Sequence, residues 1–221
     1  MTEVRQAAAP DTTALELSRA FAELGVATVY EASGREGLID IPLIPLLPGR
    51  RVAGPALTVL CGQGDNLMVH AVMERVYPGA VLVITMPEPE PVALVGELLA
   101  IQAKVRGAAA LLVDAAVRDV DELRAMDLPV WTRFIRVRGA TKDKIGQLEV
   151  PVTVGGARVA PGDIVVLDDD GAVVVARDRA EAVLEAARAR AEREARMRER
   201  LQAGELSFDI HGLRQVVEWQ R

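Results

Sequence analysis

The middle of the sequence alternates between strand-like and helix-like patterns. The segments 80–86 and 108–114 are almost wholly apolar, and between them GELLAIQAKVRG (96–107) has a helical pattern bounded by glycines. An earlier pair repeats the arrangement, with a strand pattern over 52–61 and a helix pattern over 67–76. Buried strands separated by helices are joined by right-handed parallel crossovers. The sequence therefore predicts an α/β fold with a parallel central sheet.

The N-terminal segment predicts two helices before the first strand. After about ten residues without regular structure, Thr12 or Thr13 is expected to cap a helix over 15–24, which a glycine closes. A shorter helix is expected over 27–34. The proline-rich stretch 41–49 is predicted to form an ordered loop.

The second half of the chain changes to strands with short connections and then to helix. The expected strands are 129–137, 148–154 and 163–176, the last with a hairpin turn at Asp170-Gly171. Residues 177–203 are rich in Ala, Arg and Glu and predict a long helix with a thin apolar stripe. Such a helix needs a neighbouring surface to pack on. We predict an α/β core of residues 1–176 and a helical extension, 177–221, of the same domain.

Composition narrows the class of protein. No long uncharged apolar run is present, and the N-terminus lacks the hydrophobic centre of a signal peptide, so no membrane contact is expected. Cys61 is the single cysteine, which excludes an internal disulfide and fits a reducing compartment. The net charge of −6 argues against nucleic-acid binding. We expect a cytoplasmic protein.

The scarcity of histidine and lysine limits the chemistry. Two histidines make a zinc site hard to assemble, so a metal is expected to be Mg²⁺ or Mn²⁺ bound by oxygen. Lys104, Lys142 and Lys144 are the only lysines, and none lies in an evidently buried strand. Covalent imine chemistry, which needs a desolvated lysine, is therefore disfavoured.

The candidate site joins the start of the 96–107 helix to the exit of the next strand. Unpaired N–H groups from Gly96 onward attract a carboxylate, Arg118 can grip one with two hydrogen bonds, and Asp119 offers a hard oxygen to a cation. Helix N-termini lie beside the carboxyl ends of parallel strands, so these groups should meet. Asp114 is more typical of a strand-end carboxylate than of a ligand, and its alternative role is to orient Arg118 from behind. The alternative is that these residues have only structural roles. Gly96 would then let the chain turn, and Asp119 would cap the next helix and pair with Arg118.

Other polar residues favour structural roles. The run Asp168 to Asp170 sits on a hairpin turn and lacks the alternating spacing of a calcium loop. Asp65 is more typical of a helix cap than of a ligand. His70 lies among apolar residues and is expected in the core or at a subunit contact, and Lys104 is expected to reach solvent.

Many motifs in order carry a family resemblance, from about Leu15 to Arg214. They are GPALTV, GDN with a nearby histidine, PGAVLV, GELL, AKVRGAAALLVDAAVRD, PVW, GARVAPGDIVVLDDDGAVVV and RLQAGELSFDIHGLR. Together they resemble the 4-hydroxy-4-methyl-2-oxoglutarate aldolase family, also called 4-carboxy-4-hydroxy-2-oxoadipate aldolase, with the regulator of ribonuclease activity A as a close relative.

The resemblance implies a fold, an assembly and residue roles. The fold would be a three-layer β/β/α swivelling domain, assembled as a homotrimer or hexamer. Arg118 would bind substrate oxygens, and Asp119 would hold Mg²⁺, partly through ordered waters. A glutamate of the neighbouring subunit would complete the site through water; it falls at Glu194, with Glu192 and Glu199 as alternatives. The pyruvyl carboxylate would be bound by the backbone of Gly96, Glu97, Leu98 and Leu99. Glu97 stands where the family often has Asp and is counted with the catalytic residues.

The implied function is that of a divalent-metal-dependent (class II) lyase. It would cleave 4-hydroxy-4-methyl-2-oxoglutarate to two pyruvates, or 4-carboxy-4-hydroxy-2-oxoadipate to pyruvate and oxaloacetate. Because both cleavages leave a pyruvate enolate, oxaloacetate decarboxylation should be a second activity. A metal-associated water held by carboxylates is the candidate base. The alternative is a non-catalytic regulator that binds ribonuclease E or a related RNA-processing enzyme.

Overall fold

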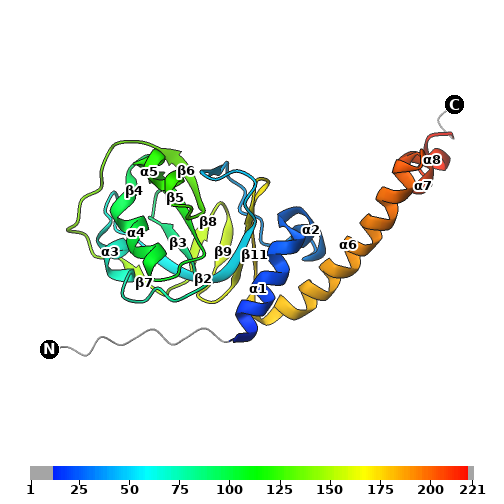
Figure 1. The fold of residues 1–221 in the computed structure, drawn as a ribbon. Coiled ribbons are helices and arrows are strands. Elements are labelled where there is room, and N and C mark those ends of the chain that lie inside the picture. Colours follow the sequence, from blue (N-terminus) through cyan, green and yellow to red (C-terminus); the bar gives the residue numbers. More distant parts are fainter. Residues whose placement is uncertain (1–11, 219–221) are drawn as a thin grey trace.

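A mixed sheet organises the chain, as the computed structural model shows for residues 12–218 (Figure 1). The strand order is β1-β6-β5-β3-β2-β10-β11, with β4 beside β5 and β7 beside β2. The predicted irregular N-terminal segment lies outside the described residues. The strand bounds are β1 Ile44–Pro45, β2 Val52–Leu60, β3 Val81–Thr85, β4 Ala93–Val95, β5 Ala110–Val117, β6 Val130–Ile135, β7 Gln147–Leu148, β8 Val152–Val154, β9 Ala157–Val159, β10 Ile164–Asp168 and β11 Gly171–Val175.

The centre of the sheet is parallel, as predicted. Strand β2 pairs in parallel with β3, β3 with β5, and β5 with both β4 and β6. Strands β10 and β11 are antiparallel additions at one edge. The hairpin between them was predicted, but its turn residues are Asp169 and Asp170 rather than Asp170-Gly171, since Gly171 already pairs with Asp168. The carboxyl ends of β3, β5 and β6 therefore open on the same edge, where open α/β sheets bind ligands.

Helices cover the sheet on one face and at one end. The helix bounds are α1 Thr12–Leu24, α2 Val26–Ala32, α3 Leu67–Val72, α4 Glu97–Val105, α5 Val120–Ala125, the 3-10 turn η1 Arg177–Arg179, α6 Ala180–Gln202, α7 Ser207–Ile210 and α8 Arg214–Glu218. Helix α1 begins at Thr12 in the described residues, so neither Thr12 nor Thr13 precedes it as a cap. Gly25 ends it with a φ of 80°, as predicted.

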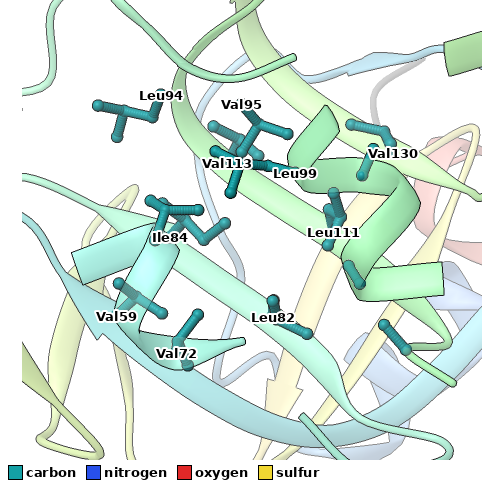
Figure 2. Close-up of a cluster of buried hydrophobic side chains, with 14 of the residues drawn as sticks. Val59, Val72, Leu82, Ile84, Leu94, Val95, Leu99, Leu111, Val113 and Val130 are labelled. Carbon is teal, nitrogen blue, oxygen red and sulfur yellow. The ribbon is translucent and has the colours of Figure 1, made fainter. Parts of the chain in front are cut away.

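Three apolar clusters divide the protein into layers. The largest lies between the sheet and α3, α4 and α5; Figure 2 shows Leu82, Ile84 and Leu111 of the strands beside Val72 and Leu99 of the helices. A second fills the opposite face of the sheet under the β8–β9 hairpin. A third packs α1, α2 and the start of α6 on β10 and β11. Helix, sheet and hairpin thus form the expected β/β/α layers. The division of the chain at residue 176 stays a prediction.

Some local features were missed or wrongly predicted. No element was expected just before Gly96, but Ala93–Val95 forms β4, which follows the end of β5 with Ala93 opposite Ala116. Three apolar residues after a proline-rich run are too few to give a strand pattern. The helix predicted over 67–76 is shorter: α3 ends at Val72. The hydrogen bonds after it, such as that from the Arg75 N–H to the Val72 carbonyl at 2.8 Å, span three residues and form tight turns. Two residues of the predicted loop form β1, which pairs with β6.

Helix α6 leaves the body of the protein. Its buried residues, Ala180, Val183, Leu184 and Ala187, all lie in its first half. Beyond them the helix projects from the core and carries α7 and α8 at its far end (Figure 1). Of the described helices, none is both long and apolar enough to cross a membrane.

Candidate functional site

The N-terminus of α4 lies against the exit of β5 because Gly96 leaves room for the side chains of Arg118 and Asp119. Gly96 is extended, at φ −138° and ψ −170°, so its backbone would accept any residue. A Cβ at this position would lie only 2.5 Å from Asp119 Oδ2 and 3.2 Å from Arg118 Nε. Glycine is therefore required here by space rather than by conformation.

Asp119 connects the two elements. It is a non-glycine residue in the left-handed region, at φ 58° and ψ 47°, a conformation that costs free energy and that tertiary contacts must hold. It stands at the N-cap of α5, but its side chain makes no cap bond there. Instead Asp119 Oδ2 accepts the Glu97 N–H at 3.0 Å, and the Arg118 Nε lies 3.7 Å from the same oxygen. The structural alternative was right about the ion pair and wrong about the capped helix.

The backbone donors of the site are fewer than predicted. The Glu97 N–H is already engaged by Asp119. Leu98 and Leu99 follow in the first turn of α4, where no helical carbonyl lies one turn earlier to accept their N–H groups. These two groups remain for an anion at the positive end of the helix.

A cavity of about 380 Å³ opens over this junction. Its size suits a small organic acid. The wall is formed by α4 and α5, the end of β5, the start of α3 and the loop after β6. The lining residues are Asn66, His70, Ala93, Gly96, Glu97, Leu98, Leu99, Arg118, Asp119, Glu122, Ala140 and Lys142.

Asn66 contributes a buried polar atom without a partner. Its Nδ2 donates to the Leu94 carbonyl at 3.0 Å, which fixes the amide. Its Oδ1 has no hydrogen-bond partner among the described residues, although Asn66 is only 8% exposed. Because an unpaired buried acceptor is costly, this atom marks a place for a ligand or water donor. Sequence reasoning did not place Asn66 in the site; it stands at the N-cap of α3, where its side chain makes no cap bond.

Two basic side chains near the cavity mouth were not predicted as site residues. His70 is exposed at the cavity, so the core position expected for it was wrong, while the alternative, a subunit contact, stays a prediction. Partial burial and the charge of Lys142 lower the pKa of His70. Lys142 lies in a loop of polar residues, RGATKDK, which carries no helix or strand pattern. Glu122, on α5, also lines the cavity and gave no signal beyond its place in a helix.

Asp65 is buried beneath this loop. Its Oδ1 accepts the Leu67 N–H at 2.7 Å, which caps the start of α3 as predicted. Its Oδ2 accepts the Thr141 hydroxyl at 2.6 Å and the N–H groups of Asp143 and Lys144 at 2.7 and 3.1 Å. Burial raises the pKa of Asp65, but these four donors outweigh burial and hold the pKa below its ordinary range.

Two predicted contributors lie away from the cavity. Asp114 does not orient Arg118; it is 2% exposed and pairs with Arg133 Nη1 at 3.0 Å. It lies within β5, three residues before the strand leaves the sheet, whereas Arg118 follows the strand's end. Glu194 forms an ion pair with Arg190 at 2.8 Å on the projecting α6. It does not reach the cavity of its own chain.

The structural assignments for the acidic hairpin and Lys104 are confirmed. Asp168 accepts the Val26 N–H at 2.8 Å and so begins α2, and Asp169 accepts the Gly49 N–H at 2.8 Å. Lys104 is exposed and bonds to the Met126 carbonyl.

The donor set fits a hard, largely hydrated cation. No cluster of three or more ligating side chains occurs within residues 12–218. Asp119 nevertheless presents a carboxylate to the cavity, and Glu97 and Glu122 line the same space. Mg²⁺ commonly binds one or two carboxylates and keeps several waters, so this set suits it better than a metal that needs a full protein cage.

Comparisons with known proteins agree with the resemblance seen in the sequence. The RraA-like family model, described as Aldolase/RraA, matches residues 26–174. A protein of Halalkalibacterium halodurans named "Putative 4-hydroxy-4-methyl-2-oxoglutarate aldolase" is 37% identical over 176 residues, which cover 78% of this chain and 84% of that protein.

Solved structures share the fold. Streptomyces coelicolor RraAS2, described as an unusual member of the RNase ES inhibitor RraA protein family, matches with a TM-score of 0.75 and 30% identity. The match covers 86% of this chain and 98% of that one. An uncharacterized protein of Pseudomonas syringae pv. tomato matches with a TM-score of 0.78 and 23% identity, over 91% and 93% of the two chains. The chain belongs to the RraA-like family of aldolases and RraA proteins.

Proposed function

We propose that this protein is a divalent-metal-dependent lyase that releases pyruvate from 4-hydroxy-2-oxo acids. The observation that carries the proposal is the junction at Gly96, where an arginine, a carboxylate and free helix N–H groups meet in one cavity. The substrates we propose are 4-hydroxy-4-methyl-2-oxoglutarate and 4-carboxy-4-hydroxy-2-oxoadipate, with oxaloacetate decarboxylation as a side activity. The first substrate matches the name of the Halalkalibacterium relative.

The residues have separate tasks in this proposal. The N–H groups of Leu98 and Leu99 bind the pyruvyl carboxylate at the positive end of α4. Arg118 places a fixed positive charge beside the 2-oxo oxygen, where negative charge develops as the carbon–carbon bond breaks. Asp119 would hold Mg²⁺ or Mn²⁺, which supplies Lewis-acid stabilisation of that charge. The Glu97 N–H, by bonding to Asp119, keeps the carboxylate in position.

A proton must leave the 4-hydroxyl group. Glu97 and Glu122 are the carboxylates that line the cavity beside Asp119, and either can hold a water that takes this proton. His70 is a second candidate, because partial burial and the charge of Lys142 lower its pKa and so favour the neutral imidazole. Glu97→Gln, Glu122→Gln and His70→Gln, compared for turnover against pH, separate the three.

The test of the proposal is pyruvate release by purified protein. We expect release from oxaloacetate and from 4-hydroxy-4-methyl-2-oxoglutarate with Mg²⁺ or Mn²⁺, loss of activity in excess EDTA, and recovery when Mg²⁺ is restored. Borohydride treatment during turnover should trap no lysine adduct. Full activity in EDTA, or a trapped adduct, would contradict the proposal.

We further propose that the active assembly is a trimer or hexamer. The outer half of α6 lies apart from its own core and needs a surface to cover it, and a neighbouring subunit would supply one. Glu194, or one of its neighbours Glu192 and Glu199, would then approach the adjacent cavity. Light scattering gives the mass. Mixing Asp119→Ala with Glu194→Ala subunits should restore partial activity; a monomeric mass, or no rescue despite verified exchange, would remove the shared site.

A non-catalytic regulator is the second candidate. The similarity to Streptomyces coelicolor RraAS2 favours it, because that protein belongs to a family of RNase ES inhibitors. In that case the protein would bind ribonuclease E or a related enzyme and release no pyruvate. The oxaloacetate assay with and without EDTA distinguishes the two functions directly.

A further inference from the structure

The loop after β6 is fastened to the protein on both sides of the cavity. We call residues 138–146 the cavity loop. On one side the Ala93 N–H donates to the Arg138 carbonyl at 2.7 Å, which ties the loop to β4. On the other, the Asn66 N–H donates to the Thr141 carbonyl at 2.9 Å, and the Thr141 N–H donates to the Gly64 carbonyl at 3.1 Å. The exposed loop is therefore held in one place.

Asp65 is the central anchor of the cavity loop. Its side chain is fully buried and receives three of its four hydrogen bonds from Thr141, Asp143 and Lys144. These donors flank Lys142 on both sides. A buried carboxylate that loses such donors is strongly destabilised, so the loop is not free to leave. The anchoring fixes the backbone from which Lys142 projects.

Lys142 brings an available positive charge to the cavity. The basic residues that line the cavity are Arg118, His70 and Lys142. Arg118 is paired with Asp119, and partial burial together with the charge of Lys142 itself lowers the pKa of His70, which disfavours a second positive charge there. Lys144, two residues away on the same loop, instead donates to the Gln63 carbonyl at 2.7 Å. Lys142 therefore supplies the cationic charge that the Arg118–Asp119 junction does not use.

We propose that Lys142, held by the Asp65-anchored cavity loop, is the specificity-determining residue that binds the second carboxylate of a dicarboxylic 2-oxo acid. The inference rests on the proposed function, since it assumes that the 2-oxo carboxylate occupies the α4 end of the cavity. A substrate whose chain extends away from that end meets the cavity loop. Asp65 is a positioning residue in this arrangement and does not touch the substrate.

The net charge of the chain favours a local cation in this role. At −6 the protein repels a dianion more than a monoanion, so a positive side chain at the second carboxylate would offset that repulsion. A hydrogen bond between charged groups is typically worth roughly tenfold or more in binding. Because Lys142 is exposed, we expect the lower end of that range.

The test compares two unreactive ligands of equal length. Both 2-oxoglutarate and 2-oxopentanoate have five carbons and lack a 4-hydroxyl, and they differ in a carboxylate against a methyl at C5. Calorimetry in saturating Mg²⁺ should show that the unmodified protein binds 2-oxoglutarate about tenfold tighter. Lys142→Met should abolish that preference and leave 2-oxopentanoate binding unchanged, and Lys142→Arg should keep part of it. Lys104→Met, which removes an exposed lysine outside the cavity, is the charge-matched control and should keep the full preference.

The positioning role of Asp65 is tested on the same quantity, the ratio of the affinities for 2-oxoglutarate and 2-oxopentanoate. Asp65→Asn should reduce the preference for 2-oxoglutarate, since an amide cannot accept from all the donors that the carboxylate serves. If Asp65→Asn fails to fold, Thr141→Val serves in its place. It removes only one of these hydrogen bonds, so it should weaken the preference for 2-oxoglutarate by a smaller factor.

The outcomes separate this inference from the proposed function. If Lys142→Met keeps the affinity ratio of the unmodified protein, or binds both ligands more weakly by the same factor, the role of Lys142 is overturned and the proposed function stands. Failure of the unmodified protein to bind either 2-oxo acid with Mg²⁺ would overturn both.

Discussion

Replacing Gly96 by alanine is the sharpest steric test of the site. The added Cβ would lie 2.5 Å from Asp119 Oδ2, so that oxygen must retreat by about 1 Å to reach an ordinary contact of roughly 3.5 Å. The Arg118 side chain must also give way, since its Cγ and Nε lie 3.1 and 3.2 Å from the new atom. Backbone strain does not enter, because Gly96 has a negative, extended φ.

The expected losses differ between activity and stability. A displacement of about 1 Å at a reacting group typically costs about 100-fold in rate. Losing the 3.0 Å bond from the Glu97 N–H to Asp119 should lower the free energy of unfolding by only about 1 kcal/mol. We therefore expect Gly96→Ala to remain folded at 25 °C, with pyruvate release reduced about 100-fold at saturating Mg²⁺.

Gly139→Ala is the matched control. Its Cβ would meet only the far end of Arg118, at 3.0 Å from Nη1, and a flexible side chain can move aside. This variant should lose less than tenfold in rate. Turnover by Gly96→Ala within a factor of two of the unmodified protein, measured by a pyruvate-coupled assay, would refute the reasoning.

Two further predictions concern charge. Arg118→Ala and Asp119→Ala should keep the circular dichroism spectrum of the unmodified protein and lose about 100- to 1,000-fold in turnover, because each removes a preorganised charge; near-normal turnover at saturating metal would place the site elsewhere. Asp65→Asn should lower the free energy of unfolding at pH 7 by about 1–3 kcal/mol. The pKa of Asp65 is lower in the folded state than in the unfolded state. Its contribution to the free energy of unfolding is therefore complete above the unfolded-state pKa of about 4 and is lost as the pH falls from there toward the folded-state pKa. Urea unfolding from pH 7 to pH 3 should show the two proteins converging; a constant difference would contradict this.

The parallel core could be predicted because its signals are local and strong. Segments such as 80–86 and 108–114 are continuous apolar runs, and glycines bound the helix between them. Strand β4 was missed because it holds only three apolar residues and gains its stability from pairing with β5, a contact between separate parts of the chain.

The site could be predicted only in part, for the same reason. Gly96 and Arg118-Asp119 stand at ends of elements that the sequence pattern defines. The left-handed backbone of Asp119 and its bond to the Glu97 N–H arise from tertiary contacts. Lys142 lies in a polar loop whose place over the cavity is set by the buried Asp65, and no sequence pattern reports that contact.

Exchange of the methyl protons of pyruvate tests the central claim most directly. A site that stabilises the pyruvate enolate must form it from pyruvate itself, in the reverse of the last step. In D₂O with Mg²⁺, proton NMR should show the methyl signal of pyruvate disappearing with the unmodified protein, and persisting with EDTA or with Asp119→Ala. Exchange that continues in both controls, or no exchange with the metal-loaded protein, would contradict the assignment of enolate chemistry to this cavity.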